Sequence, residues 1–355
     1  ITIEKNTSKR IIPETEADLF VGNSGTTVRF LTAMLSLGQG CYRLDGVARM
    51  RERPIQDLLD TLTEQLGVRA MSETGNGCPP VQIVANGQWR GGVVAVRSSI
   101  SSQFLSGLLL AAPFAGLETE LCPSGELVSE PYVTMTVKML GDWMCEVKQT
   151  ASGYRVYPLR SGLGGPSSYV IEPDASAASY FWAIPAIPGG RITVSGLTRK
   201  SLQGDVRFVD LLEQMGCRVE ECEAGITVHG GKLHGIDVDM NDISDTVMTL
   251  TAVACFAEGP TTIRNVAHIR HKETDRITAL ATELRKLGAK VEERPDGLTI
   301  TPASLRGCAV DTYNDHRMAM SLALIGLKVP SVVIRNPGCV AKTYPGFWED
   351  LKRLM

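Results

Sequence analysis

Apolar side chains recur every three or four residues in four segments of the chain, which predicts four amphipathic helices. Each predicted helix ends at a glycine, and the four glycines are Gly67, Gly141, Gly216 and Gly288. We expect them at the C′ position, where the backbone adopts a positive φ that glycine tolerates best. Alternating apolar and polar residues after each glycine predict a β-hairpin.

A second kind of helix is predicted where small or polar residues lead into an apolar run. These openings lie at residues 24–27, 101–103, 174–176, 244–246 and 314–317. Their Ser, Asp and Asn residues are typical N-caps. The four glycines stand 74, 75 and 72 residues apart (67, 141, 216, 288), so the chain repeats a unit of about 70 residues. Five such units begin along the chain, and the fifth ends it.

The repeated alternation of strands and helices predicts an α/β protein with two domains. A Pro-, Gly- and Ser-rich stretch at residues 161–168 is the best boundary, with two units before it and three after it. We therefore expect one domain over residues 1–171 and a second over residues 172–355. The first would hold one unit fewer than the second.

Composition excludes several classes of protein. The 355 residues are 43% hydrophobic with a net charge of −3, which argues against disorder and against a general attraction to nucleic acid or anionic lipid. No apolar run reaches the roughly 18–20 residues of a membrane span. Nine scattered cysteines without a CxxC pair, and only five histidines, predict a reduced, cytoplasmic protein without disulfides or a bound metal.

Basic residues stand where a helix start should disfavour them. Lys272 and Arg276, expected on one helical face, bracket the start of one predicted amphipathic helix, and others occupy equivalent places: Arg53, Arg317 and Lys342. One such residue would be an ordinary solvated side chain. Recurrence at the same boundary instead indicates an anion site, because helix N-termini and guanidinium or ammonium groups bind phosphates and carboxylates together.

Two carboxylates lie among these cations. Asp245 stands at a predicted helix start, where it is either an N-cap or a group that moves protons. Glu273 lies between Lys272 and Arg276, where it forms either a local ion pair or a second proton-transfer group. A glycine-rich loop at residues 22–26 opens a helix without completing a known nucleotide-binding motif.

Six segments, in order along the whole chain, carry a resemblance to a known family: residues 22–26 (GNSGT), 51–54 (RERP), 101–104 (SSQF), 272–276 (KETDR), 314–320 (NDHRMAM) and 341–343 (AKT). The chain resembles the 5-enolpyruvylshikimate-3-phosphate (EPSP) synthases, the targets of glyphosate in aromatic amino-acid biosynthesis. The resemblance implies the enolpyruvyl transferase fold, a two-domain inside-out α/β barrel of βαβαββ units with an active site in the interdomain cleft. It also implies transfer of the enolpyruvyl group of phosphoenolpyruvate to the 5-hydroxyl of shikimate 3-phosphate, with release of phosphate and without a metal or organic cofactor.

Site residues follow from the same resemblance, position by position. Shikimate 3-phosphate would contact Ser101, Ser102, Gln103, Ser129, Tyr132, Asp245 and Lys272. Phosphoenolpyruvate would contact Asn23, Gly25, Arg53, Gln103, Arg276, Arg317 and Lys342. Asp245 would accept the proton of the 5-hydroxyl, and Glu273, helped by Lys342 or His316, would add and remove the proton of the methylene carbon.

Three departures from the family pattern stand out. His268 replaces a common Asn or Ser, and Phe30 replaces a common Pro. A first unit of about 70 residues, with cationic substrate ligands, would precede Ile1, supplied in the same chain or as a separate one. We expect the 355 residues alone to be a poor catalyst and the complete protein to be a monomer. The rival interpretations are a UDP-N-acetylglucosamine enolpyruvyl transferase and an inactive, binding-only fragment of the same fold.

Overall fold

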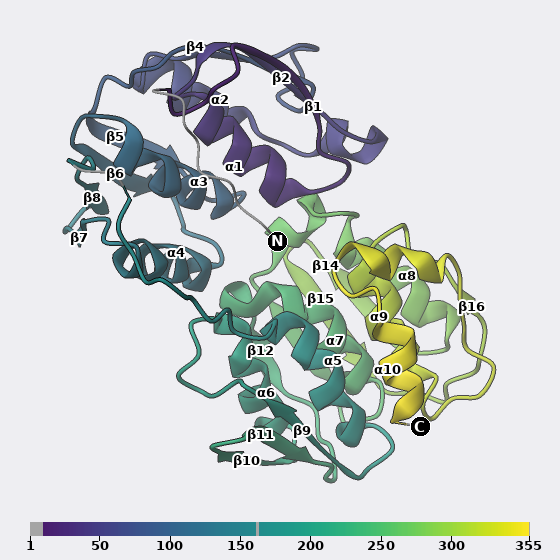
Figure 1. Cartoon of the computed structure of the whole chain (residues 1–355). Helices are drawn as coiled ribbons and strands as arrows, with labels where there is room; N and C mark the ends of the chain where they lie inside the picture. Colours follow the sequence, from purple (N-terminus) through teal and green to yellow (C-terminus); the bar gives the residue numbers. More distant parts are fainter. Residues whose placement is uncertain (1–9, 161–162, 355) are drawn as a thin grey trace. The chain divides into compact units, whose positions relative to one another are not determined.

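A computed structural model describes residues 10–160 and 163–354 (Figure 1). Contacts between residues divide the chain into two compact units, residues 1–169 and residues 170–355, each with a core of its own. Both are built from the same succession of strand, helix, strand, helix and hairpin. Among the described residues no helix is long and apolar enough to cross a membrane.

The first unit contains two complete repeats. Its strands are β1 (Glu16–Phe20), β2 (Gln39–Asp45), β3 (Arg69–Ser72), β4 (Val81–Asn86), β5 (Gly92–Arg97), β6 (Thr119–Ser124), β7 (Val147–Gln149) and β8 (Tyr154–Val156). Its helices are α1 (Gly25–Leu35), α2 (Gln56–Asp60), α3 (Gln103–Ala111) and α4 (Glu130–Asp142), with short helices η1 (Ala48–Glu52), η2 (Thr61–Gln65) and η3 (Ala112–Phe114).

The second unit continues the pattern with three more repeats. Its strands are β9 (Arg191–Ser195), β10 (Arg218–Cys222), β11 (Gly225–His229), β12 (Asp237–Asp239), β13 (Thr261–Arg264), β14 (Lys290–Arg294), β15 (Gly297–Thr301), β16 (Ala309–Val310) and β17 (Val333–Ile334). Its helices are α5 (Ala175–Ala186), α6 (Phe208–Gln214), α7 (Val247–Ala254), α8 (Arg276–Lys286), α9 (His316–Ile325) and α10 (Phe347–Arg353), with η4 (Gly204–Arg207), η5 (Asn241–Thr246), η6 (Ala267–His271) and η7 (Pro337–Lys342).

Each complete repeat forms one four-stranded mixed sheet. The strand orders are β1-β2-β4-β3, β5-β6-β8-β7 and β12-β13-β15-β14, so the same arrangement recurs three times. The first two strands of each repeat pair in parallel across a helix, and the last two form an antiparallel hairpin. The repeat of α5 departs from this pattern, because within the described residues β9 pairs only with β11 and residues 163–174 contain no strand.

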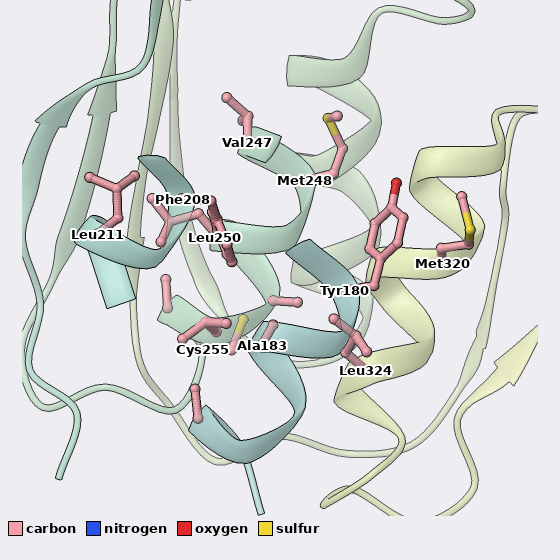
Figure 2. Packing of buried hydrophobic residues seen from close by; sticks show 14 of the residues in the cluster. Tyr180, Ala183, Phe208, Leu211, Val247, Met248, Leu250, Cys255, Met320 and Leu324 are labelled. Atoms are coloured by element: carbon pink, nitrogen blue, oxygen red, sulfur yellow. The ribbon is translucent and has the colours of Figure 1, made fainter. Parts of the chain in front are cut away.

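The helices that open with small residues are the inner ones. In the second unit α5, α7 and α9 pack against one another (Figure 2). Every residue of α7 is buried. Phe208 and Leu211 of α6 join the same core. A helix that is apolar on all sides is stable only when other elements surround it, so the sheets and the amphipathic helices form the outer layer. This is why one helix type lacks a polar face.

Small and hydroxyl-bearing residues let the inner helices approach closely. Ser179 of α5 lies 3.0 Å from Thr249 of α7, whose hydroxyl lies 3.4 Å from that of Ser321 of α9. In the first unit, a Cβ added to Gly107 of α3 would lie 3.3 Å from the carbonyl oxygen of Arg29 on α1. These contacts fix the mutual spacing of helices whose N-termini carry the candidate site residues.

Three of the four predicted C′ glycines are confirmed: Gly67, Gly216 and Gly288 have φ of 77°, 110° and 101°. The fourth prediction is wrong, because α4 continues through Gly141 and ends at Asp142. Met144 adopts the positive φ instead, at 60°, and the next N–H, of Cys145, donates to the carbonyl of Leu140. A Cβ on Gly141 would meet no atom within 4 Å, so nothing there requires glycine.

We expect Leu250→Ala on α7 to lower the free energy of unfolding by about 2–5 kcal/mol, because Leu250 is fully buried between inner helices and its truncation leaves a cavity. Urea unfolding followed by circular dichroism measures the change. Leu354→Ala is the control, since Leu354 is 49% exposed. Equal effects of the two substitutions would contradict the assignment of α7 to the centre of the core.

Candidate active site

Arg53 is one of two buried cations described in the first unit, at 3% exposure. It lies between η1 and α2, which begins at Gln56, and its guanidinium donates to the backbone oxygen of Asn23 at 2.9 Å. A Cβ on Gly25 would collide with this guanidinium, so glycine at the start of α1 leaves room for it. The structure thus brings together Asn23, Gly25 and Arg53, three residues that the sequence placed around one anion.

Arg29 organises the same region and was missed as a site residue by the sequence analysis. It is 2% exposed, and its guanidinium donates to Gln103 at 2.8 Å and to the Ser101 hydroxyl at 3.3 Å. It also lies over the ring of Phe104, 5.1 Å from the centroid. A buried arginine holding two predicted ligands indicates a positioning role. The signal in the sequence was a lone charge within the apolar run of a helix.

The remaining predicted ligands of the first unit lie at the starts of two neighbouring helices. Ser101 and Ser102 immediately precede α3, and both are buried. Ser129 immediately precedes α4 with a φ of 52°, and Tyr132 lies in the first turn of α4. Helices α3 and α4 pack together through a 3.1 Å hydrogen bond between the hydroxyls of Thr136 and Ser106.

Arg276 lies at the centre of the charged cluster in the second unit. Its guanidinium is 1% exposed and donates to three carboxylates: Asp315 at 2.9 Å, Glu273 at 2.9 Å and Asp245 at 3.1 Å. Burial works against a charge here, but these three carboxylates raise the pKa of Arg276 above its ordinary range. Arg276 is the first residue of α8, so the cation stands at a helix N-terminus as the sequence predicts.

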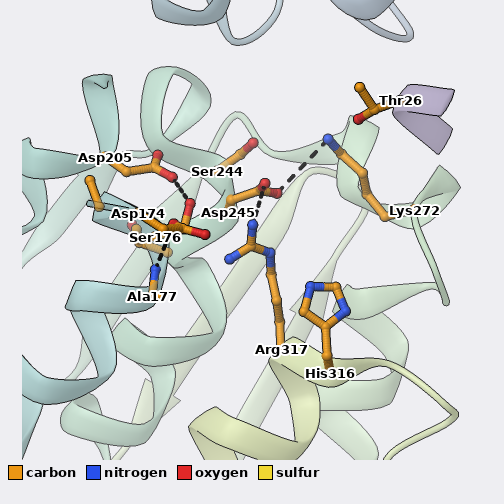
Figure 3. A network of polar contacts seen from close by, with 12 residues as sticks. Thr26, Asp174, Ser176, Ala177, Asp205, Ser244, Asp245, Lys272, His316 and Arg317 are labelled. Carbon is orange, nitrogen blue, oxygen red and sulfur yellow. Dashed lines mark hydrogen bonds and ion pairs between the residues drawn. The ribbon is translucent and has the colours of Figure 1, made fainter. Parts of the chain in front are cut away.

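Asp245 is held by cations and is not a helix cap. It belongs to η5, whereas α7 begins at Val247 with Thr246 as its N-cap. Arg317 donates to its carboxylate at 2.8 Å, and Lys272 lies 3.9 Å away (Figure 3). Burial would raise the pKa of Asp245, but the positive charges of Arg317, Lys272 and Arg276 outweigh it and lower the pKa well below its ordinary range.

Glu273 pairs with two cations from different elements. It accepts from Arg276 and forms a short ion pair with Lys342, the last residue of η7. Lys272 and Arg276 do not share a helical face, contrary to the prediction, because Lys272 precedes α8 in an extended conformation. Residues 272–274 instead form a bend before α8 that directs Lys272 to Asp245 and Glu273 to Lys342.

Two buried histidines border this cluster. Burial, followed by the charge of Lys272, lowers the pKa of His268 to about 3, and its Nε2 lies 2.9 Å from the Ser244 hydroxyl. Burial, followed by the charge of Arg317, lowers the pKa of His316 to about 4. Both imidazoles are therefore neutral near pH 7, and His316 carries no spare proton as an imidazolium.

Asp315 is the second residue that the sequence analysis did not single out by role. It is fully buried, caps α9 by accepting from the Arg317 N–H at 2.9 Å, and binds Arg276. The described residues contain no group of three or more His, Cys, Asp or Glu side chains placed to hold a metal ion. The second-unit cluster instead combines four cations with three carboxylates, a composition suited to multiply charged anions.

Solved structures define the class of fold. An EPSP synthase from Acinetobacter baumannii superposes with a TM-score of 0.74 at 27% identity, covering 94% of this chain and 78% of that one. The enolpyruvyl transferase NikO from Streptomyces tendae gives a TM-score of 0.70 at 23% identity, covering 91% and 75%. The chain therefore has the enolpyruvyl transferase fold, as the sequence predicted.

Sequence comparison then identifies the family. A family model described as EPSP synthase (3-phosphoshikimate 1-carboxyvinyltransferase) matches residues 1–351. A 3-phosphoshikimate 1-carboxyvinyltransferase of Nostoc punctiforme is 49% identical over 346 residues, covering 97% of this chain and 80% of the relative. One from Marinomonas sp. is 46% identical over 333 residues, covering 94% and 78%. The chain belongs to the EPSP synthase family and is a 3-phosphoshikimate 1-carboxyvinyltransferase, which confirms the predicted enzyme class over its UDP-N-acetylglucosamine rival.

We expect the two buried histidines to make the fold acid-sensitive. The unfolded chain takes up protons on histidine below about pH 6.5, whereas folded His268 and His316 stay neutral down to pH values near 3 and 4. The contribution of these two histidines to the free energy of unfolding is therefore fully present above pH 6.5. It falls as the pH drops toward 4, by up to about 1.4 kcal/mol per pH unit for each histidine.

Urea unfolding between pH 7 and pH 5 measures this slope. His268→Asn, which cannot titrate, is expected to show a shallower slope than the wild-type protein. His234→Asn is the matched control, because His234 lies outside the cluster, where its backbone forms an isolated β-bridge with Glu258. A His268→Asn slope equal to that of wild type would contradict the neutral state assigned to the buried imidazole.

Proposed function

We propose that the two groups of residues described above bind the two substrates of the reaction, shikimate 3-phosphate and phosphoenolpyruvate. Both substrates carry several negative charges, and both groups contain buried cations whose side chains are held in place. The observation that carries the proposal is the convergence of Arg317, Arg276 and Lys272 on the carboxylate of Asp245. That the two groups share one interdomain cleft stays a prediction.

Phosphoenolpyruvate binding is proposed for Asn23, Gly25, Arg53, Gln103, Arg276, Arg317 and Lys342. Support comes from the placement of Arg317 and Lys342, which are 13% and 30% exposed and pair with the side-chain carboxylates of Asp245 and Glu273. An entering phosphate or carboxylate could take over these pairs without new cations having to move in. Arg276 would mainly hold the protein carboxylates in position, because its own guanidinium is already saturated by three of them.

Shikimate 3-phosphate binding is proposed for Ser101, Ser102, Gln103, Ser129, Tyr132, Asp245 and Lys272. The serines stand at the starts of α3 and α4, where backbone N–H groups and hydroxyls favour a phosphate. Arg29 supports this role, because it fixes the positions of Ser101 and Gln103 from behind.

Asp245 is proposed as the base that accepts the proton of the 5-hydroxyl. In the resting state its carboxylate is a weak base, because three cations stabilise the charged form. Substrate anions that pair with Arg317 and Lys272 would withdraw these charges from Asp245 and raise its pKa. The base would then become effective only when the substrates are bound.

Proton transfer at the methylene carbon is proposed for Glu273 with Lys342 and His316. The short ion pair between Glu273 and Lys342 offers an acid and a base side by side. His316, neutral and 3% exposed, fits a role in orienting its neighbours better than one as the proton donor. We also propose a reducing, cytoplasmic location, on the basis of nine free cysteines.

Asp245→Asn is expected to lower kcat by about 10²–10⁴, because the amide keeps the shape of the carboxylate but cannot accept the proton. Phosphate release with both substrates measures turnover. Asp242→Asn is the control, since Asp242 lies in the same η5 helix but pairs with Arg207 at the surface. Wild-type turnover in Asp245→Asn would refute the role of Asp245 as the base.

Arg317→Gln is expected to weaken the binding of phosphoenolpyruvate by about 10- to 100-fold, which is the effect of losing one charged hydrogen-bond partner. The affinity for shikimate 3-phosphate should change far less. Arg317 is a cleaner test than Arg276, because removal of Arg276 would also strand the fully buried charge of Asp315. Titration calorimetry with each substrate decides, and unchanged phosphoenolpyruvate affinity would remove Arg317 from its binding site.

A further inference from the structure

Glu283 is a fully buried carboxylate outside the cluster of candidate site residues. It lies on α8, seven residues after Arg276, and both side chains are almost completely excluded from water. Seven residues are two helical turns, so Arg276 and Glu283 share one face of α8. That face meets the loop of residues 311–315, which joins β16 to α9.

The Glu283 carboxylate binds this loop at two points. Its Oε1 accepts from the hydroxyl of Tyr313 at 2.6 Å, and its Oε2 accepts from the backbone N–H of Asp311 at 3.0 Å. Lys286, one turn further along α8, donates to the same carboxylate at 2.8 Å and to the side chain of Asp311 at 2.8 Å. Glu283 is therefore bound to both backbone and side chain of a segment about 30 residues away.

The loop that Glu283 holds has an unfavourable backbone. Tyr313 and Asn314 adopt φ of 54° and 55°, two adjacent residues in the left-handed region that non-glycine residues avoid. Such a conformation persists only when surrounding contacts impose it. Asn336 contributes one of these contacts by donating to the side chain of Asn314 at 3.2 Å.

The strained pair leads directly into the site. Asp315 follows and caps α9, and His316 and Arg317 form the first turn of that helix. Arg276 fixes the end of the loop through Asp315, while Glu283 fixes its beginning and its middle. Helix α8 thus holds the loop from both sides, with one cation and one anion on the same face.

We propose that Glu283 is a positioning residue for the reaction, which acts through Tyr313 to hold the start of α9 and so the guanidinium of Arg317. This inference rests on the proposed role of Arg317 in binding phosphoenolpyruvate. A carboxylate needed only as the partner of Lys286 could remain at the surface, where Lys286 itself is 39% exposed. Complete burial is unfavourable for a carboxylate and is offset here by the bonds to the loop.

Tyr313→Phe tests the proposal, because it removes only the hydroxyl that Glu283 accepts from. We expect faster amide hydrogen exchange in residues 311–318 and a KM for phosphoenolpyruvate raised about tenfold, the size expected for one lost bond to a charged group. The KM for shikimate 3-phosphate should stay within about twofold of wild type. Tyr42→Phe is the control, since it removes a buried phenolic hydroxyl that donates to the backbone oxygen of Glu14 in the first unit.

A double-mutant cycle with Glu283→Gln separates positioning from a general loss of stability. If Glu283 acts through Tyr313, the KM of the double variant for phosphoenolpyruvate should be no higher than that of the more affected single variant. Additive effects of the two substitutions on this KM would overturn the proposal. So would a Tyr313→Phe variant whose amide hydrogen exchange and KM equal those of the wild-type protein. Wild-type protein without phosphate release would instead contradict the proposed function, and the exchange rates of residues 311–318 would still decide the role of Glu283 in holding the loop.

Discussion

The guanidinium of Arg276 is the group on which the second unit's site depends. One buried cation joins three carboxylates that come from three separate elements: Asp245 from η5, Glu273 from the turn before α8, and Asp315 from the start of α9. Each carboxylate would be unfavourable alone in this poorly hydrated place. Because the guanidinium is planar and offers several fixed donors, it sets the angles between its partners as well as their distances. The three elements therefore keep one relative arrangement before any substrate arrives.

The outer cations of the cluster have a different character. Arg317 pairs with Asp245 and Lys342 with Glu273, and both are more exposed than Arg276, so under the proposed function a ligand would replace these partners at modest cost. Preorganised charges of this kind favour catalysis, because little of the protein has to rearrange as charge develops on the reacting groups. In the first unit, Arg29 donates to amide and hydroxyl oxygens and Arg53 donates to a backbone oxygen. In both units the most deeply buried cation orients other residues.

The repeat, the two helix types and most of the cation positions could be predicted from the sequence, because they depend on local patterns. Glycines at a fixed spacing and small residues at helix starts are such patterns. Gly141 was misassigned because a helix can end on another residue when its final carbonyls find partners, as Leu140 does with Cys145. The local pair of Glu273 with Arg276 could be predicted as one of two alternatives. The contacts of Arg276 with Asp315, of Arg29 with Gln103 and of Glu283 with Asp311 could not, because those partners lie more than 25 residues away and depend on how the helices pack. For the same reason, the sequence around Asp245 fits both an N-cap and a proton acceptor.

The line of hydroxyls through α5, α7 and α9 has a consequence for how such an enzyme can change during evolution. Ser179, Thr249 and Ser321 lie on three successive inner helices, with the Thr249 hydroxyl in contact with the other two. A bulkier side chain at Thr249 would press on both α5 and α9 and displace the helix starts together. The scaffold is therefore nearly closed to gradual adjustment from within. New substrate preferences have to arise from exchanges in the short segments just ahead of these helices, where single residues alter one contact without disturbing the others.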